Sequence, residues 1–258
     1  MNIVVLVKQV PDSGSERTLR AEDNTVERQS SDNVINEMDE YAIEEALTLT
    51  EGGGEVTILT MGPEQAKETI RKALSMGAHK AIHVTDEALH GSCALQTSAV
   101  LAKALGTVEW DLVLCGAEST DGQVAVMPAM LAERLDVPHL TGARKLTVDG
   151  SKLTVERQTD GGYWILQATA PAIVSVWDTI NEPRYPSFKG IMAAKSKPVT
   201  TLTLADLGID TAEVGADNAT SKVLSFAGRP PKEAGQVVKD EGDGAAKLAD
   251  FLAGQKFL

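Results

Sequence analysis

The chain has 258 residues, of which 43% are hydrophobic and 24% charged, and its formal net charge is −13. This composition is typical of a globular protein with one large core, and no apolar run approaches the roughly 18 residues that span a bilayer. The acidity argues against nucleic-acid binding, because neutralising phosphates requires a basic face. Residues 1–8 are too few and too soon interrupted for a secretory signal, so we expect a cytoplasmic protein.

The first half of the chain alternates apolar runs with helical patterns. Continuous apolar runs predict strands covered on both faces at residues 3–7, 56–60, 81–84 and 111–115. Helices are expected between them, and Asn36 precedes the first one as a predicted N-cap. Strands that alternate with helices at this spacing indicate right-handed parallel crossovers, hence a doubly wound sheet.

The second half has a different rhythm. Segments 145–148, 152–158, 163–169 and 172–176 are joined partly by Asp-Gly turns, which favour hairpins, so we expect antiparallel strands that extend the same sheet. Beyond residue 198 the pattern loosens. The predicted fold is therefore α/β: a doubly wound, mainly parallel sheet extended by antiparallel hairpins, with a C-terminal arm. The expected division is 1–198 for the core and 199–258 for the arm.

The end of the arm carries a helical pattern. Leu248, Phe251 and Leu252 recur at helical spacing within residues 245–258. A short amphipathic helix on a long tether rarely stabilises itself, so we expect it to pack on a partner subunit.

The segment 115–123 is the sharpest candidate for a ligand site. It reads C-G-A-E-S-T-D-G-Q, follows a predicted buried strand and precedes a predicted helix at about 124–135. Ligands of α/β sheets bind at the carboxyl ends of the strands, and the free N–H groups of a helix start receive phosphates. Gly116 and Gly122 would permit close backbone approach. An ordinary strand-to-helix turn explains the spacing equally well, because no glycine-rich dinucleotide motif or Walker lysine is present.

A second candidate is the segment 183–190, P-R-Y-P-S-F-K-G, which places aromatic residues between prolines. Arg184, Lys189, Lys195 and Lys197 make it a basic island in an acidic chain. The pattern indicates either a solvated turn or a docking surface whose rigid loop presents an aromatic anchor.

Other polar groups suggest no chemistry. The four histidines lack metal-ligand spacing, so we expect no metal site. Cys93 and Cys115 are expected to be buried free thiols in a reducing compartment. Glu44, Glu45 and Glu51 are expected to form a solvated helix face, and no catalytic residue is predicted.

Two motifs together carry a family resemblance. The D-G-G hairpin at residues 160–162 and the run N-E-P-R-Y-P-S-F-K-G-I-M-A-A-K from residue 181 resemble the β subunit of non-bifurcating bacterial electron-transfer flavoproteins. The resemblance extends from residue 1 to about 208. It implies an electron carrier, not an enzyme, that forms a heterodimer with an α subunit.

The resemblance also implies cofactors and the residues that bind them. AMP would be held in this chain and FAD mainly by the α subunit. Residues 119–127 would wrap the phosphate, and the ends of two strands and one helix would enclose the ribose and adenine. The residues implied in cofactor binding are Leu6, Asn36, Thr60, Met61, Gly116, Ser119, Asp121, Gly122, Gln123, Val124, Ala125, Val126 and Met127.

The implied partners are dehydrogenases and a quinone reductase. A loop at 181–197 would dock acyl-CoA dehydrogenases or similar flavin dehydrogenases of fatty acid β-oxidation, and electrons would pass on to a membrane quinone oxidoreductase. Phe188 falls where the family places an apolar anchor, often Leu. The residues implied in docking are Arg184, Tyr185, Phe188, Lys189 and Lys195.

Two rival functions stay open. A bifurcating flavoprotein subunit would bind its own FAD, but such members carry Asp-Gly-Asp-Thr where this chain has Asp121-Gly122 followed by Gln123-Val124. An ATP-using enzyme of similar fold would need a Ser- and Gly-rich loop after the first strand, where this chain reads K-Q-V-P-D at residues 8–12.

Overall fold

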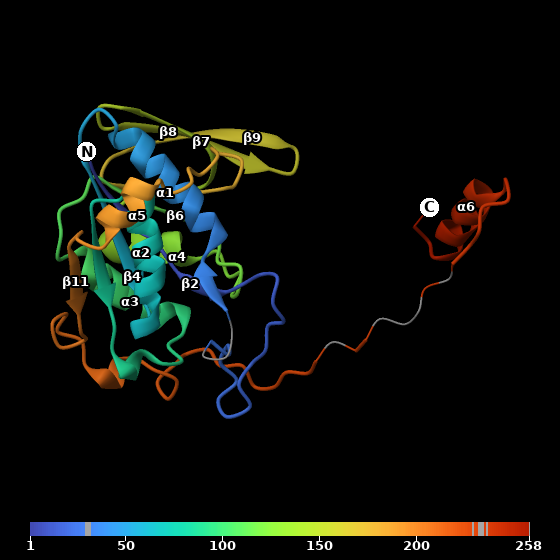
Figure 1. Ribbon diagram of the computed structural model, residues 1–258, viewed down its shortest axis with the longest axis horizontal. Helices are drawn as coiled ribbons and strands as arrows, with labels where there is room; N and C mark the ends of the chain where they lie inside the picture. Colours follow the sequence, from blue (N-terminus) through green and yellow to red (C-terminus); the bar gives the residue numbers. More distant parts are fainter. Residues whose placement is uncertain (29–31, 229, 232–234, 236, 258) are drawn as a thin grey trace. The chain divides into compact units, whose positions relative to one another are not determined.

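The computed structural model describes residues 1–28, 32–228, 230–231, 235 and 237–257. The chain divides into two units, Met1–Leu224 and Ser225–Leu258. The larger unit is a nine-stranded sheet with helices on both faces (Figure 1).

The bounds of the elements follow in chain order. The strands of the large sheet are β1 (Asn2–Leu6), β4 (Glu55–Met61), β5 (Lys80–Val84), β6 (Leu112–Gly116), β7 (His139–Asp149), β8 (Lys152–Thr159), β9 (Gly162–Thr169), β10 (Ala172–Val176) and β11 (Val199–Leu202). A separate ribbon pairs β2 (Gln9–Pro11) with β3 (Asn33–Ile35). The α-helices are α1 (Glu37–Thr50), α2 (Lys67–Met76), α3 (Ala94–Leu105), α4 (Met127–Leu135), α5 (Phe188–Ala194) and α6 (Gly244–Gly254). The short 3-10 helices are η1 (Glu64–Ala66), η2 (Glu87–Leu89) and η3 (Thr211–Glu213).

The strand order is β11-β5-β4-β1-β6-β10-β7-β8-β9. All pairs from β11 to β7 are parallel, and β7, β8 and β9 form an antiparallel meander. The predicted α/β class and the antiparallel extension are thereby confirmed. The helices α1, α2 and α5 contribute to the core on one face of the sheet, and α3 and α4 to the core on the other.

One strand differs from the sequence prediction. We expected residues 172–176 to continue the antiparallel hairpins, but β10 lies between β6 and β7 and is parallel to both. The physical reason is burial: every residue of β10 is buried, as is typical of a central parallel strand.

The expected division at residue 198 also differs from the structure. The strand β11 pairs with β5, and Leu204, Leu207 and Val214 are buried in the core, so the compact unit continues to Leu224. The second unit contains α6, on which Leu248 and Phe251 are more than half exposed. Within the described residues, no helix is long and apolar enough to cross a membrane.

Candidate functional site

The candidate site lies where the strand order reverses. The strand β1 has β4 on one side and β6 on the other, and a crevice at the carboxyl ends of such strands is where α/β sheets bind ligands. Leu6 ends β1, and Gly116 ends β6. Thr60 and Met61 end the neighbouring β4. The structure thus brings the predicted residues of three separate segments to one edge of the sheet.

The loop from β6 to α4 has an unusual backbone. Gln123 and Ala125 have φ angles of 50° and 55°, which non-glycine residues rarely adopt. Consequently α4 begins at Met127, three residues later than predicted, with Pro128 in its first turn and no side-chain cap on its N-terminus. Residues 122–125 are exposed. Strained loops that precede an uncapped helix offer N–H groups to a ligand.

Asn36 shapes this loop. The predicted N-cap bond is absent, and the Asn36 side chain is turned toward the loop instead. Its Nδ2 donates to the Glu118 carbonyl at 3.0 Å, and its Oδ1 accepts from the Thr120 N–H at 3.0 Å. Asn36 is 1% exposed, so these two bonds tie the loop to the start of α1 within the protein interior.

Asp39 joins the ends of the two central strands. Its carboxylate accepts from the Lys8 N–H at 2.8 Å and from the Gly116 N–H at 3.1 Å. Burial raises its pKa to about 7, although both N–H donors favour the charged form. Gly116 is needed for the same contact: a Cβ there would lie 2.5 Å from the Cβ of Met38. The structure therefore shows one close approach at Gly116, to α1.

The pH dependence of folding should report on Asp39. A carboxyl whose pKa is raised in the folded state favours folding below its ordinary pKa of 3.8, and this contribution is lost as the pH rises to about 7. We expect Asp39→Asn, which cannot ionise, to escape that loss. The change in the free energy of unfolding over this pH range should therefore differ between the two chains by a few kcal/mol, since one pKa unit corresponds to about 1.4 kcal/mol. Urea unfolding curves of both chains between about pH 4 and pH 7 measure it. The variant also loses a hydrogen bond to the backbone, which lowers its free energy of unfolding by a similar amount at every pH. The expectation is contradicted if the two plots of free energy of unfolding against pH run parallel.

The docking segment, residues 181–197, is fixed to α1 and α2. Arg184 donates through Nε and Nη2 to the Glu44 carboxylate at 2.7 and 2.8 Å, and Asn181 donates to Glu45 at 3.0 Å. Burial opposes ionisation of Glu44, but the bonds from Arg184 outweigh it and lower its pKa. The prediction of a solvated face at Glu44 and Glu45 is therefore wrong, because both side chains are buried against this segment.

The basic island divides into two groups. Arg184 and Lys197 serve the fold: Lys197 Nζ donates to the carbonyls of Leu74 and Ala78 at the end of α2. Lys189 and Lys195 are exposed. Arg184 thus positions the segment, and its side chain remains 40% exposed.

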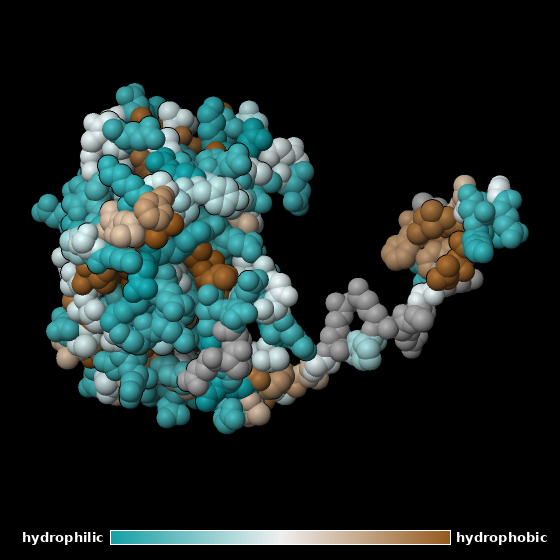
Figure 2. Space-filling model, in the orientation of Figure 1, coloured by the Kyte–Doolittle hydropathy of each residue, from teal (hydrophilic) through white to brown (hydrophobic). Residues whose placement is uncertain are grey.

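An apolar face lies on the docking segment. Ser187 caps α5, and a Cβ on Gly190 would lie 2.4 Å from the Ser75 carbonyl, so α5 packs directly on α2. Phe188 is nevertheless 81% exposed, and Figure 2 shows apolar residues gathered over α5. The exposed apolar side chains of the segment are Tyr185, Phe188, Ile191 and Met192.

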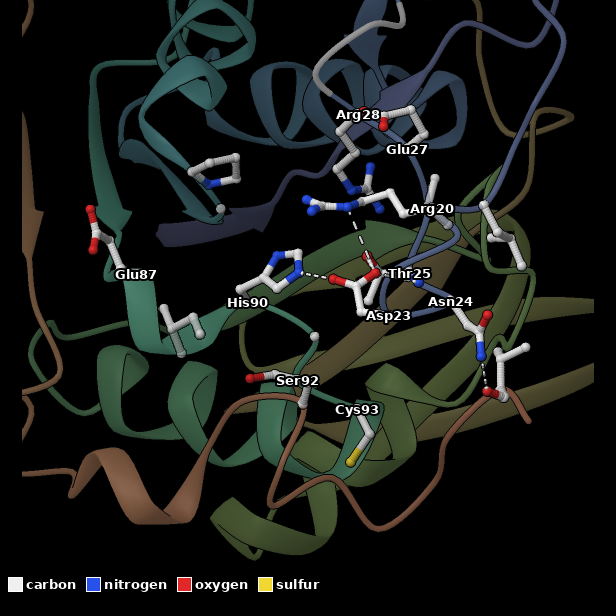
Figure 3. A pocket seen from close by; sticks show the side chains of 18 of the residues that line it. Arg20, Asp23, Asn24, Thr25, Glu27, Arg28, Glu87, His90, Ser92 and Cys93 are labelled. Atoms are coloured by element: carbon white, nitrogen blue, oxygen red, sulfur yellow. Dashed lines mark hydrogen bonds and ion pairs between the residues drawn. The ribbon is translucent and has the colours of Figure 1, made fainter. Parts of the chain in front are cut away.

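A cavity of about 1170 Å³ lies at the carboxyl ends of β4 and β5 (Figure 3). It is lined by the ends of β4 and β5, by residues 19–28 and by residues near 216–224. Asp23 forms a hydrogen bond to His90 at 2.7 Å across the cavity, and this bond holds the pKa of Asp23 well below its ordinary range.

Cys93 also lines this cavity, contrary to our expectation of a buried thiol. Burial opposes ionisation of Cys93, but hydrogen bonds, the largest from Thr220, lower its pKa to about 6. Cys115 is buried as expected.

Sequence reasoning missed three cations of the site. Lys8, Arg17 and Arg28 all bond the loop at 119–121. Their only signal in the sequence is their positive charge in an acidic chain, in a segment without hydrophobic periodicity. Among the described residues, no cluster of His, Cys, Asp or Glu could hold a metal ion.

Comparisons with known proteins identify the family of the chain. Residues 23–207 match the electron transfer flavoprotein domain. Over its full length the chain is 53% identical to the electron transfer flavoprotein subunit beta of Mycobacterium leprae, 99% of which is covered. The proteins of the same name from Thermoanaerobacterium thermosaccharolyticum and Megasphaera elsdenii are 39% and 35% identical over 92% and 97% of this chain, with 92% and 96% of their own lengths covered. The chain belongs to the electron transfer flavoprotein family and aligns over at least 92% of its length with these three β subunits.

Proposed function

We propose that this chain is the β subunit of a heterodimeric electron-transfer flavoprotein. It binds AMP, supports FAD that is held mainly by the α subunit, and docks acyl-CoA dehydrogenases or similar flavin dehydrogenases. Electrons then pass to a membrane quinone oxidoreductase, as in fatty acid β-oxidation, and the heterodimer works in the cytoplasm. End-to-end similarity to proteins named as β subunits supports the assignment.

The loop at 119–127 fits an adenine nucleotide. Its exposed backbone leads into the uncapped start of α4, where N–H groups can receive a phosphate. At the end of β4 the Thr60 Oγ1 is buried without a hydrogen-bond partner in the described part of the chain. Such orphaned groups are rare, and a ribose or base at the strand ends would satisfy it. AMP would serve as a structural ligand that this loop orients.

The docking geometry is the observation that carries the electron-transfer role. Glu44 holds Arg184, and α2 holds α5, so the segment presents Phe188 in a fixed conformation. An exposed aromatic side chain on a rigid support is suited to a partner's apolar pocket, because little entropy is lost on docking. The exposed Lys189 and Lys195 beside it favour a partner with an acidic rim.

Coexpression with the α subunit tests the proposal. We expect a 1:1 complex whose flavin absorbance is bleached by a flavin dehydrogenase and its substrate, whereas the chain alone should carry no FAD. FAD bound to the isolated chain would favour the bifurcating rival, and hydrolysis of ATP by it would favour the ATP-using rival.

A further inference from the structure

Three cations converge on one short loop. Lys8 Nζ lies 2.7 Å from Asp121 and 3.2 Å from the Ser119 Oγ. Arg28 Nη2 lies 2.6 Å from the other oxygen of the Asp121 carboxylate, and Arg17 donates to the Thr120 carbonyl. In a chain of net charge −13 this is a local excess of positive charge, because one carboxylate faces two of the three cations directly.

The Asp121 carboxylate accepts hydrogen bonds from donors that could also bind a phosphate. Its Oδ1 accepts from the Lys8 ammonium and from the Gly122 N–H, both at 2.7 Å. A backbone N–H paired with a lysine is also a donor set that binds phosphate oxygens in glycine-rich loops. Burial opposes ionisation of Asp121, but Lys8 and Arg28 outweigh it and hold its pKa well below the ordinary range. The carboxylate is therefore charged at neutral pH.

The cations can take a second acceptor. The Lys8 side chain is 43% exposed, and its ammonium has three donors, of which Asp121 and Ser119 take two. Arg28 bonds Asp121 and the Gln9 carbonyl, and its guanidinium also lines the cavity shown in Figure 3. A Cβ on Gly122 would lie 3.9 Å from Lys8 Nζ, so the Gly122 backbone and the Lys8 ammonium are close neighbours.

We propose that Lys8 and Arg28 form a phosphate subsite for the adenine nucleotide, and that Asp121 orients both cations while it competes with the phosphate for them. The inference rests on the proposed nucleotide function and extends it. Side chains from the segment before α1 would then recognise the phosphate together with the backbone N–H groups of the loop. The subsite takes a phosphate monoester rather than a neutral nucleoside, because its donors are cationic.

The affinity ratio of AMP to adenosine isolates the phosphate. We expect Lys8→Gln and Arg28→Gln each to reduce the preference for AMP over adenosine about tenfold, since each removes one cation near the phosphate. Asp121→Asn should raise the preference severalfold, because it removes the competing anion. Lys80→Gln is the matched control: Lys80 pairs with Glu55 at 2.7 Å at the amino end of β5, away from the ligand edge. Calorimetric titration of the nucleotide-stripped heterodimer with AMP and with adenosine measures the ratios.

The outcomes separate the two proposals. If the parent heterodimer binds neither AMP nor adenosine, the nucleotide function fails and this inference fails with it. If AMP binds but Lys8→Gln and Arg28→Gln keep the parent's preference, or Asp121→Asn lowers it, the subsite is wrong and the nucleotide function stands. Lys8→Arg keeps the charge and should keep the preference, which distinguishes the loss of a cation from a folding defect.

Discussion

Replacement of Phe188 by alanine is expected to weaken docking of the cognate dehydrogenase about thirtyfold. Loss of a buried aromatic anchor commonly costs about 2 kcal/mol or more in binding, and 1.4 kcal/mol corresponds to a factor of ten. FAD content and melting temperature should stay nearly unchanged, because Phe188 is 81% exposed and stabilises little of this chain's own core. Reduction of the heterodimer's flavin at increasing dehydrogenase concentration measures the effect as a rise in KM.

Two comparisons sharpen this test. Leu95→Ala removes a partly exposed apolar side chain on α3, across the sheet from α5, and should leave the KM unchanged. Lys189→Ala and Lys195→Ala should mainly slow association and weaken its salt dependence. A large fall in melting temperature for Phe188→Ala, or an unaltered KM, would exclude the anchor role.

Deletion of residues 244–258 is expected to weaken heterodimer assembly by at least about a hundredfold while the core of this chain stays folded. The helix α6 exposes Leu248 and Phe251, and burial of each against a partner would contribute about 1.5–3 kcal/mol. Residues 1–224 form a unit with its own core, so the deletion removes little internal packing. Titration of the α subunit into each chain measures the dissociation constants.

The helix offers its own control. Substituting Ser for Leu248 and Phe251 should reproduce most of the loss, whereas Ser at Lys247 and Asp250 changes polar positions of the same helix and should not. Equal dissociation constants for the deleted and full-length chains would show that α6 does not pack on the α subunit.

Much of the fold could be predicted because the signals are local. Continuous apolar runs marked β1, β4, β5 and β6, and Asp-Gly turns marked the hairpins. The placement of β10 could not be predicted from its turn, because strand direction within a sheet depends on a long-range crossover. Its pattern, which is apolar except for Ser175, was the better indicator.

The candidate site was less accessible to sequence reasoning. The loop was recognised because it follows a buried strand, but its cations come from residues about 90 to 110 positions earlier and meet it only in the folded chain. The buried roles of Glu44 and Glu45 were missed for the same reason, because their partners lie about 140 positions away. Acidic residues on a helix predict exposure unless a distant cation is known.

The nucleotide content of the purified heterodimer tests the central claim most directly. Denaturation followed by chromatographic separation should release one FAD and one AMP per heterodimer, because the loop after Asp121 lacks the second acid and the Thr of FAD-binding members. Two FAD per heterodimer and no AMP would contradict this account and identify the chain as a bifurcating subunit with its own flavin.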